Sequence, residues 1–229
     1  MRVRVDVGTD VPTLRWEDVH GPARGVMYEL LAGQDPMLAK SLHENGPGSG
    51  GTGPLGVAIP QFRGAASRNG VYTTSQDGSI WMGSPIPEIA GNLVSAISAR
   101  REIRWGAALL KIKGFAVDMP LSSTEKTFEL ITATPVVLRD GARYLLPDDD
   151  RYTECLRENL ERKADFLGLP PPLDVGVVAA GPRRRMVVKG TLRVGARLRV
   201  RVEADPRLVE ALRSWGLGMD TIQGFGWIR

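Results

Sequence analysis

Apolar and polar residues alternate strictly at the start of the chain. Valines occupy positions 3, 5 and 7 with charged residues between them, and a period of two predicts a β-strand with one buried face. Helical spacing follows in three segments, 24–31, 37–44 and 87–97. Strands are predicted at 55–59, at 71–74 and 79–83 as a hairpin around Asp77-Gly78, and within 103–118, where Trp105 is expected in the core. This order is that of a ferredoxin-like fold.

The second half repeats the order. Residues 128–138 are strongly β-prone, and Asp140-Gly141 is predicted to form a turn that connects them to residues 142–146. A helix is predicted over 147–163. Strict alternation from Arg193 predicts another strand, and helix 207–215 precedes a short apolar strand at the end of the sequence. We predict an α+β protein of two tandem ferredoxin-like βαββαβ domains with antiparallel sheets, residues 1–120 and 121–229.

Composition narrows the class of protein. The chain has 229 residues, 42% apolar and 24% charged, as in ordinary globular proteins. No apolar run approaches the length of a membrane span, and the first residues are typical of a strand rather than a signal peptide. Cys155 is the only cysteine, so an intrachain disulfide is excluded, a cysteine zinc site is disfavoured and a cytoplasmic location is expected.

Metal, cofactor and nucleotide sites are not predicted. Asp148, Asp149 and Asp150 could bind a metal, but three acidic residues before a helix favour capping and the helix dipole more strongly. The Gly/Ser run 46–53 lacks the Gly-Lys-Ser/Thr ending of a phosphate loop, and no dinucleotide motif stands between a strand and a helix. A nucleotide-dependent enzyme is therefore disfavoured.

Positive charge is concentrated in one stretch, although the net charge is only +4. Between Arg183 and Arg201 there are eight basic residues and no acidic ones, which is typical of a polyanion-binding surface or, alternatively, of a solvated basic face. The alternation places four of the arginines on one strand face, where they repel one another unless they meet an anion. Guanidinium groups suit phosphate. The candidate RNA-binding residues are Arg183, Arg184, Arg185, Lys189, Arg193, Arg197, Arg199 and Arg201.

Four glycines form a second candidate site near residue 229. Gly216-Leu-Gly218 and Gly224-Phe-Gly226 flank a five-residue spacer. Glycine permits positive φ and close approach of another backbone, and free N–H groups in such a loop can surround an anion. The alternative is a helix C-cap at Gly216 followed by a flexible turn.

His43 is the candidate for proton transfer. Asp35 and Pro36 are predicted to open the second helix, which places His43 in its last turn, where the helix dipole favours a cation. Imidazole can give or take a proton near neutral pH, although a solvated or capping role is the alternative. Lys40 lies one turn earlier on the same face and could supply positive charge or be merely solvated. We interpret His20 as a loop residue.

Three motifs resemble one protein family. The glycine pattern is similar to the glycine-rich loop of the RAMP superfamily, and more narrowly of the CRISPR-associated repeat-RNA endoribonucleases, the Cas "six" family. Tyr28-Glu-Leu-Leu31 and the run from Asp35 to Gly46 resemble that family's YxLL and DPxLAxxLHxxG segments. The run from Thr134 to Lys163 resembles its PVVLR, DG and YLLPDDxxYxExLxxNLxxK segments. One departure is the Gly/Ser run after His43, where many members have a lysine.

The resemblance implies an activity and partners. His43 would be the general acid or base, with Tyr28 assisting and Lys40 or an arginine replacing the absent lysine. The protein would cut CRISPR repeat RNA (pre-crRNA) without a metal, by attack of a 2′-hydroxyl, leaving a 2′,3′-cyclic phosphate and a 5′-hydroxyl. Partners would be the repeat RNA or crRNA and other proteins of a CRISPR interference complex, with a homodimer left open. The alternative is a non-catalytic crRNA-binding subunit, since related RAMP proteins bind without cutting.

Overall fold

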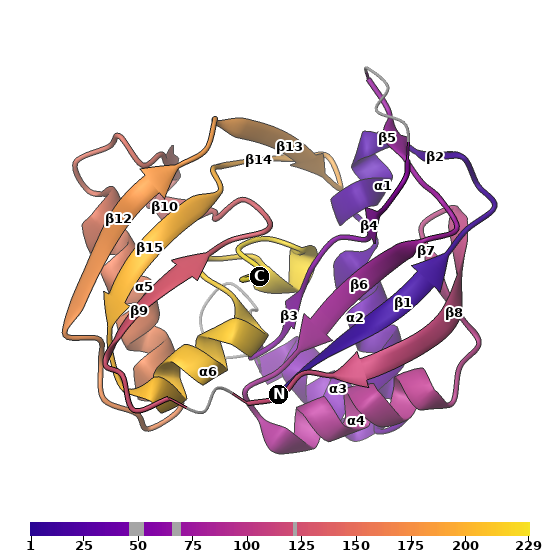
Figure 1. The fold of residues 1–229 in the computed structure, drawn as a ribbon, viewed down its shortest axis with the longest axis horizontal. Coiled ribbons are helices and arrows are strands. Elements are labelled where there is room, and N and C mark those ends of the chain that lie inside the picture. Colours follow the sequence, from indigo (N-terminus) through magenta and orange to yellow (C-terminus); the bar gives the residue numbers. More distant parts are fainter. Residues whose placement is uncertain (46–52, 66–69, 121–122) are drawn as a thin grey trace.

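The computed structural model describes residues 1–45, 53–65, 70–120 and 123–229. Figure 1 shows two α/β halves side by side, the N-terminal half on the right and the C-terminal half on the left, with the last residues of the chain between them. Each half consists of an antiparallel sheet with helices against it. The predicted α+β class, with two tandem ferredoxin-like units, is confirmed. Most of the Gly/Ser run 46–53 lies outside the described residues.

The sheet of the N-terminal half has the order β3-β6-β1-β8-β7, and β4 also pairs with β6. Because β1 is central, its three valines are fully buried. The first four strands of this order occupy ferredoxin-like positions, and β7 extends the edge. The strands are β1 (Arg2–Gly8), β3 (Gly56–Val57), β4 (Gln61–Phe62), β6 (Gly78–Gly83), β7 (Glu102–Trp105) and β8 (Ala108–Val117).

The helices in the described residues of this half are α1 (Trp16–His20), α2 (Ala23–Ala32), α3 (Pro36–Asn45) and α4 (Pro87–Ser98). The predicted start of α3 is confirmed, because Oδ1 of Asp35 accepts a hydrogen bond from the Leu38 amide at 2.9 Å. The short helix α1 is not predicted by the periodicity, since five residues are too few to show an apolar stripe. It nevertheless forms one wall of the site described below.

The C-terminal half has the sheet order β12-β15-β9. The final residues occupy the fourth ferredoxin-like position beside β9 through a bridge between Thr132 and Ile228, with the Ala133 amide donating to the Trp227 carbonyl at 2.7 Å and the Arg229 amide donating to the Ile131 carbonyl at 3.0 Å. The predicted last strand is therefore reduced to a bridge. The elements are β9 (Thr127–Ile131), α5 (Tyr152–Phe166), β12 (Asp174–Ala180), β15 (Leu198–Glu203) and α6 (Pro206–Trp215), with the hairpins β10 (Leu138–Asp140) to β11 (Arg143–Leu145) and β13 (Arg184–Val188) to β14 (Thr191–Gly195).

Two strand predictions are wrong. The hairpin around Asp77-Gly78 does not form, because β5 (Tyr72–Thr73) pairs with β2 (Thr13–Leu14) while β6 pairs with β1, β3 and β4. The β-prone run 128–138 is interrupted after Ile131, since the segment before Leu138 bridges to Ala196, Met219 and Ile228 instead. Both errors reflect strand pairing between distant segments, which local propensity does not encode.

The halves have separate hydrophobic cores. The first includes Val5, Leu30 and Trp105, and the second includes Tyr152 and Val200. Ile222, from the glycine loop, packs into the first core, so the end of the chain joins the halves. We propose that the domain boundary lies at residue 120. Among the described residues, the buried members of the first core end at Leu110, apart from Ile222, and those of the second begin at Leu130.

Arg2 ties the two halves together at the start of β1. Its Nε lies 2.6 Å from the Asp118 carboxylate, and its Nη1 donates to the Ile228 carbonyl at 2.9 Å. Its guanidinium also lies 4.9 Å from the ring centre of Trp81, which in turn is 6.4 Å from that of Trp227. These contacts hold the last residues of the chain against the N-terminal sheet. None of the helices described here is both long and apolar enough to cross a membrane.

Candidate functional site

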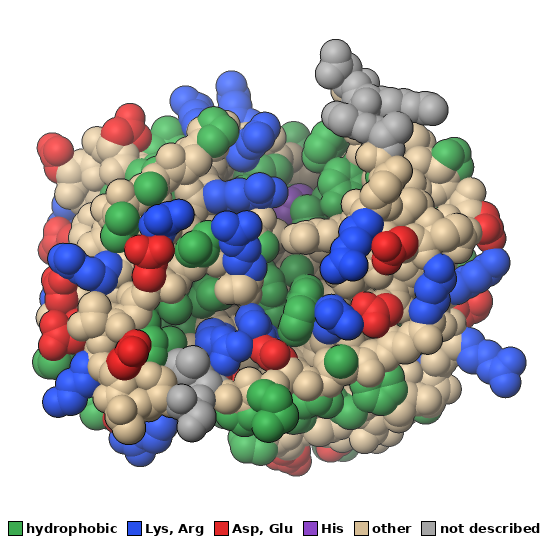
Figure 2. Space-filling model, viewed as in Figure 1, with side chains coloured by type: hydrophobic (Ala, Val, Ile, Leu, Met, Phe, Trp, Pro, Cys, Tyr) green, Lys and Arg blue, Asp and Glu red, His purple; other side chains and the backbone are tan. Residues whose placement is uncertain are grey.

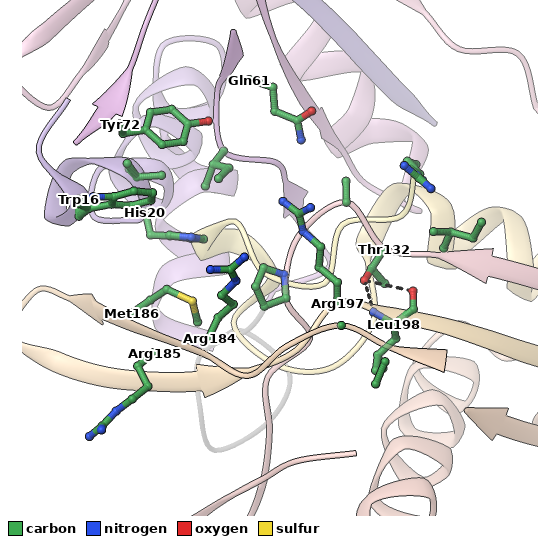
Figure 3. A pocket seen from close by; sticks show the side chains of 18 of the residues that line it. Trp16, His20, Gln61, Tyr72, Thr132, Arg184, Arg185, Met186, Arg197 and Leu198 are labelled. Atoms are coloured by element: carbon green, nitrogen blue, oxygen red, sulfur yellow. Dashed lines mark hydrogen bonds between the residues drawn. The ribbon is translucent and has the colours of Figure 1, made fainter. Parts of the chain in front are cut away.

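A cleft of about 980 Å³ lies between the two halves. Figure 2 shows Lys and Arg side chains on both sides of the hollow and apolar groups within it. The N-terminal half contributes Trp16, His20, Gln61 and Tyr72, and the C-terminal half contributes residues of β12, β13, β15 and the segment after β9 (Figure 3). Four of the predicted arginines line it, Arg184, Arg185, Arg197 and Arg199, together with Arg229.

The basic residues around the cleft differ in how free they are. Arg183, Arg184, Arg185, Lys189 and Arg197 are exposed, and their side chains form no hydrogen bond or ion pair within the described part of the chain. Their charges are therefore available to an anion in the cleft or along its rim. Unpaired guanidinium groups are suited to phosphate.

The predicted stripe of four arginines on one strand is wrong. The alternating stretch is split into β14 and β15, because Ala196 leaves the strand to bridge with Val136. Arg193 consequently lies on the β13–β14 hairpin and pairs with Asp220 at 2.6 Å. Arg199 and Arg201 stay on β15, where they lie 3.5 Å from Glu129 and 3.7 Å from Asp174. These exposed pairs are weak, so phosphate could displace the acidic partners of both arginines on β15.

His43 and Tyr28, predicted from the resemblance, lie in contact. His43 is exposed in the last turn of α3. Its ring meets the Tyr28 ring edge-on, with centres 5.2 Å apart and planes at 83°. The Tyr28 hydroxyl donates to the Leu42 carbonyl at 3.3 Å. The imidazole thus stands on the surface, held on one side by the phenol ring.

Arg24 completes this cluster and was not predicted. Its Nη2 lies 3.4 Å from Nδ1 of His43, and its guanidinium lies 5.6 Å from the centre of the Tyr28 ring. The sequence does contain a signal, because positions 24 and 28 are one helical turn apart and share a face of α2. Lys40 is also exposed, one turn before His43, and forms no ion pair with any described residue.

The His43 cluster does not line the large cleft. A smaller hollow of about 350 Å³ is lined by Glu17 and Asp18 of α1, by Gly21, Pro22 and Gly25 around the start of α2, by Gly106, and by Lys189 and Gly190 at the tip of the β13–β14 hairpin. The basic hairpin therefore spans from the cleft to the helix that carries Arg24 and Tyr28. A bound strand could follow the hairpin from one site to the other.

The glycine loop is packed, not open. Gly216, Gly218, Gly224 and Gly226 all have positive φ and are buried. Their amides donate in turn to the Leu212 carbonyl, to Oδ1 of Asn159, and to the carbonyls of Thr221 and Pro135, at 2.6, 3.0, 3.3 and 2.8 Å. The expectation of free amides around an anion is therefore wrong. The spacer forms a 3₁₀ turn, η1 (Thr221–Gln223), rather than a flexible segment.

Lys163 holds the start of this loop. Its ammonium donates to the Gly216 carbonyl at 2.6 Å and lies 4.9 Å from the ring centre of Trp215. Burial lowers the pKa of Lys163 to about 7. A buried ammonium needs such partners, so this lysine fixes the junction between α6 and the loop.

His20 belongs to the cleft, so its interpretation as a loop residue is wrong. It is the last residue of α1 and is buried. Its ring stacks on Phe225 with centres 4.3 Å apart and planes at 7°, and its Nδ1 lies 3.0 Å from the Gln223 carbonyl. Because a carbonyl only accepts, Nδ1 carries the proton. Burial lowers the pKa of His20 to about 4, so the ring is neutral and Nε2 is an acceptor.

The predicted capping of α5 by the acidic triplet is wrong, because the helix begins after Arg151 without a side-chain cap, and Asp149 instead holds the turn before the helix. Oδ2 of Asp149 accepts the Leu146 amide at 2.6 Å, and its carboxylate also pairs with Arg143. The Asp149 carbonyl accepts the Tyr152 amide at 2.9 Å. These contacts form the turn that leads into the helix.

Comparison with known proteins agrees with the fold. The family described as CRISPR associated protein Cas6, C-terminal, matches residues 117–229. A Cas6-related protein from Pyrococcus furiosus has a TM-score of 0.82 at 19% identity, covering 100% of this chain and 97% of its own. A RAMP protein described as binding different RNA substrates has a TM-score of 0.81 at 20% identity, covering 100% and 98%.

A third structure, a Cas6 product complex, has a TM-score of 0.64 at 18% identity, covering 99% of this chain and 98% of its own. No curated protein matches the chain. At these identities the structures show a shared fold, while the match over residues 117–229 identifies the C-terminal domain. Residues 117–229 therefore belong to the Cas6 family of CRISPR-associated proteins, and the whole chain shares the fold of the Cas6-related and RAMP structures.

Proposed function

We propose that this protein is a metal-independent endoribonuclease that cleaves CRISPR repeat RNA into guide RNAs. The proposal rests on the match of residues 117–229 to a family involved in CRISPR RNA processing and on one observation. An exposed imidazole, His43, stands in contact with a phenol and a guanidinium at the surface. Such a group can reach an RNA backbone and move a proton there.

The reaction needs only proton transfer and charge stabilisation. The ribose 2′-oxygen attacks the adjacent phosphorus, a new O–P bond forms, and the bond to the 5′-oxygen breaks. One proton leaves the 2′-hydroxyl and one is delivered to the 5′-oxygen, giving a 2′,3′-cyclic phosphate and a 5′-hydroxyl. His43 performs one of these two transfers, Tyr28 orients its ring, and Lys40 offsets charge on the phosphorane.

Arg24 links the arrival of substrate to the state of His43. Nη2 of Arg24 lies 3.4 Å from Nδ1 of His43, so the guanidinium covers this ring nitrogen in the free protein. A phosphate attracts guanidinium more strongly than a neutral imidazole does. When the RNA phosphate draws Arg24 away, Nδ1 of His43 is uncovered and the imidazole can approach the RNA.

The RNA follows the basic residues. Arg184, Arg185 and Arg197 bind phosphates in the cleft, and Lys189 carries the strand over the small hollow toward His43. Arg183, Arg193, Arg199 and Arg201 flank this path. The four loop glycines contribute by packing, since they place Phe225 against His20. Counterion release makes such binding fall steeply with salt.

The direct test is His43→Ala on the repeat RNA encoded beside the gene. Cleavage should fall roughly 100-fold or more, the usual range for loss of an acid or base, while the Kd for RNA changes less than about twofold. Met37→Ala is the matched control, an exposed residue two turns earlier on α3, and should cleave normally. A chelator should leave the rate unchanged. Normal cleavage by the His43 variant refutes the residue assignment, and inhibition by the chelator refutes metal independence.

A second candidate is a crRNA-binding subunit that does not cut. One observation favours it, namely that the arginine-lined cleft and His43 do not share a cavity. The same assay separates the two, because a binding subunit shifts the labelled RNA without producing a shorter fragment.

A further inference from the structure

Helix α1 presents two aromatic side chains to the cleft. Trp16 and His20 are four positions apart, so they lie one turn apart on the same face, and both line the cleft (Figure 3). Trp16 is 56% exposed, although tryptophan is normally well covered. Its ring packs edge-on with Tyr72, with centres 5.5 Å apart, and the Tyr72 hydroxyl donates to the Pro60 carbonyl. An anchored, exposed indole beside unpaired arginines is a surface on which a base can stack.

His20 adds a specific hydrogen-bonding group beside that surface. Its Nδ1–H is used by the Gln223 carbonyl at 3.0 Å, and one ring face is covered by Phe225. Nε2 has no partner among the described residues and keeps its lone pair, since burial holds the pKa of the ring near 4. The arginines around it can only donate. Nε2 therefore selects a ligand that offers a donor.

We propose that the cleft holds one unpaired nucleotide of the RNA, with its base stacked on Trp16 and its exocyclic amino group donating a hydrogen bond to Nε2 of His20. This inference rests on the proposed function and identifies what the cleft reads. With an amino group as the donor, the base is adenine, cytosine or guanine, because uracil offers only its N3–H. It must be unpaired, because pairing uses that group and buries the face needed for stacking.

The rest of the cleft fits a nucleotide in this position. Its volume of about 980 Å³ is at the upper end of ligand pockets, so a base, its sugar and the flanking phosphates can enter together. Arg184 and Arg197 come from the opposite wall (Figure 3) and carry free guanidinium groups toward those phosphates. The base contacts supply selectivity, and the arginines supply most of the affinity.

The test is a binding scan with the full-length His43→Ala protein and repeat RNAs that each lack one amino group. Purine riboside replaces adenosine, a pyrimidin-2-one riboside replaces cytidine, and inosine replaces guanosine, one unpaired position at a time. At one position, removal of the amino group should weaken RNA binding roughly tenfold, the order expected for a lost hydrogen bond. His20→Phe, which keeps a ring on Phe225, should abolish that position's sensitivity.

Trp16→Ala provides the second arm. It should weaken binding roughly 5- to 150-fold, the range for loss of one base stack, and an abasic residue at the sensitive position should remove the difference between wild type and variant. A flat scan, or unchanged sensitivity in His20→Phe, overturns the inference. If His20→Phe does not fold, the scan on the His20 protein still decides, because a flat result alone overturns it. If the wild-type protein cleaves the repeat but the scan shows no sensitive position, only this inference is refuted. If the protein does not bind repeat RNA at all, the proposed function is refuted as well.

Discussion

Gly226→Ala tests whether the glycine loop acts by packing. Gly226 has φ +64°, and a Cβ built on it would overlap the carbonyl oxygen of Leu217. Gly168, after α5, also has φ +64°, but a Cβ there meets nothing within 4 Å. The two positions therefore share the backbone strain of an alanine at positive φ and differ only in the space around it.

The structure sets the size of the difference. An L-residue in the left-handed region costs about 1–2 kcal/mol, and the reduced entropy of the unfolded chain returns about 0.4–1 kcal/mol. Gly168→Ala should thus lose about 1 kcal/mol. In Gly226→Ala the new methyl group also overpacks against the backbone of Leu217, whose amide donates to the Gly226 carbonyl at 2.9 Å. Overpacking of this kind typically costs about 1–3 kcal/mol more.

Urea unfolding followed by circular dichroism measures both variants. We expect Gly226→Ala to be less stable than Gly168→Ala by about 2 kcal/mol, equivalent to a Tm about 4–8 °C lower for a chain of this size. Repeat-RNA binding should weaken in Gly226→Ala alone, because the loop positions Phe225 behind His20. Equal stability of the two variants would refute the packing argument.

Two further predictions concern buried cations. Folding lowers the pKa of Lys163 from 10.5 to about 7, so between these values the unfolded chain binds more protons and stability should rise with pH. Lys163→Met should reduce the slope of the unfolding free energy against pH, measured between pH 7 and 9. The reduction should be less than about 1.4 kcal/mol per pH unit, because the contacts with Gly216 and Trp215 favour the charged form of the lysine. Parallel curves of unfolding free energy against pH for the wild type and the variant would contradict this. Arg2→Met removes the contacts to Asp118 and Ile228, but Asp118 keeps Arg213 at 2.8 Å, so the loss should be about 2 kcal/mol. A Tm shift below about 2 °C in thermal unfolding would show that Arg2 does not hold the halves together.

The candidate catalytic pair was predicted from the family resemblance, and local pattern supplied only the helices that carry its two residues. Tyr28 and His43 lie on consecutive helices, and their ends follow from Asp35, Pro36 and the apolar spacing. The short turn between these helices allows them to pack against each other, and this packing brings the His43 ring against the Tyr28 ring. Arg24 follows from the same geometry once the helix face of Tyr28 is considered.

The cleft could not be predicted in this way. His20 and Gln223 are 203 positions apart in the chain, and whether the arginines are free depends on acidic partners such as Asp220 and Glu129 from other elements. The pairing of β5 with β2 is another such contact. No local pattern contains information about these partners.

The sequence by itself determined the two-unit α+β fold, the longer helices and the start of the helix that carries His43, because periodicity and capping act over a few residues. Tertiary structure alone decided which charges are neutralised, that the loop amides are all used within the protein, and that His20 faces the cleft. These outcomes depend on how the two sheets dock. Docking brings together residues that are far apart in the sequence, and no local sequence pattern predicts which of them meet.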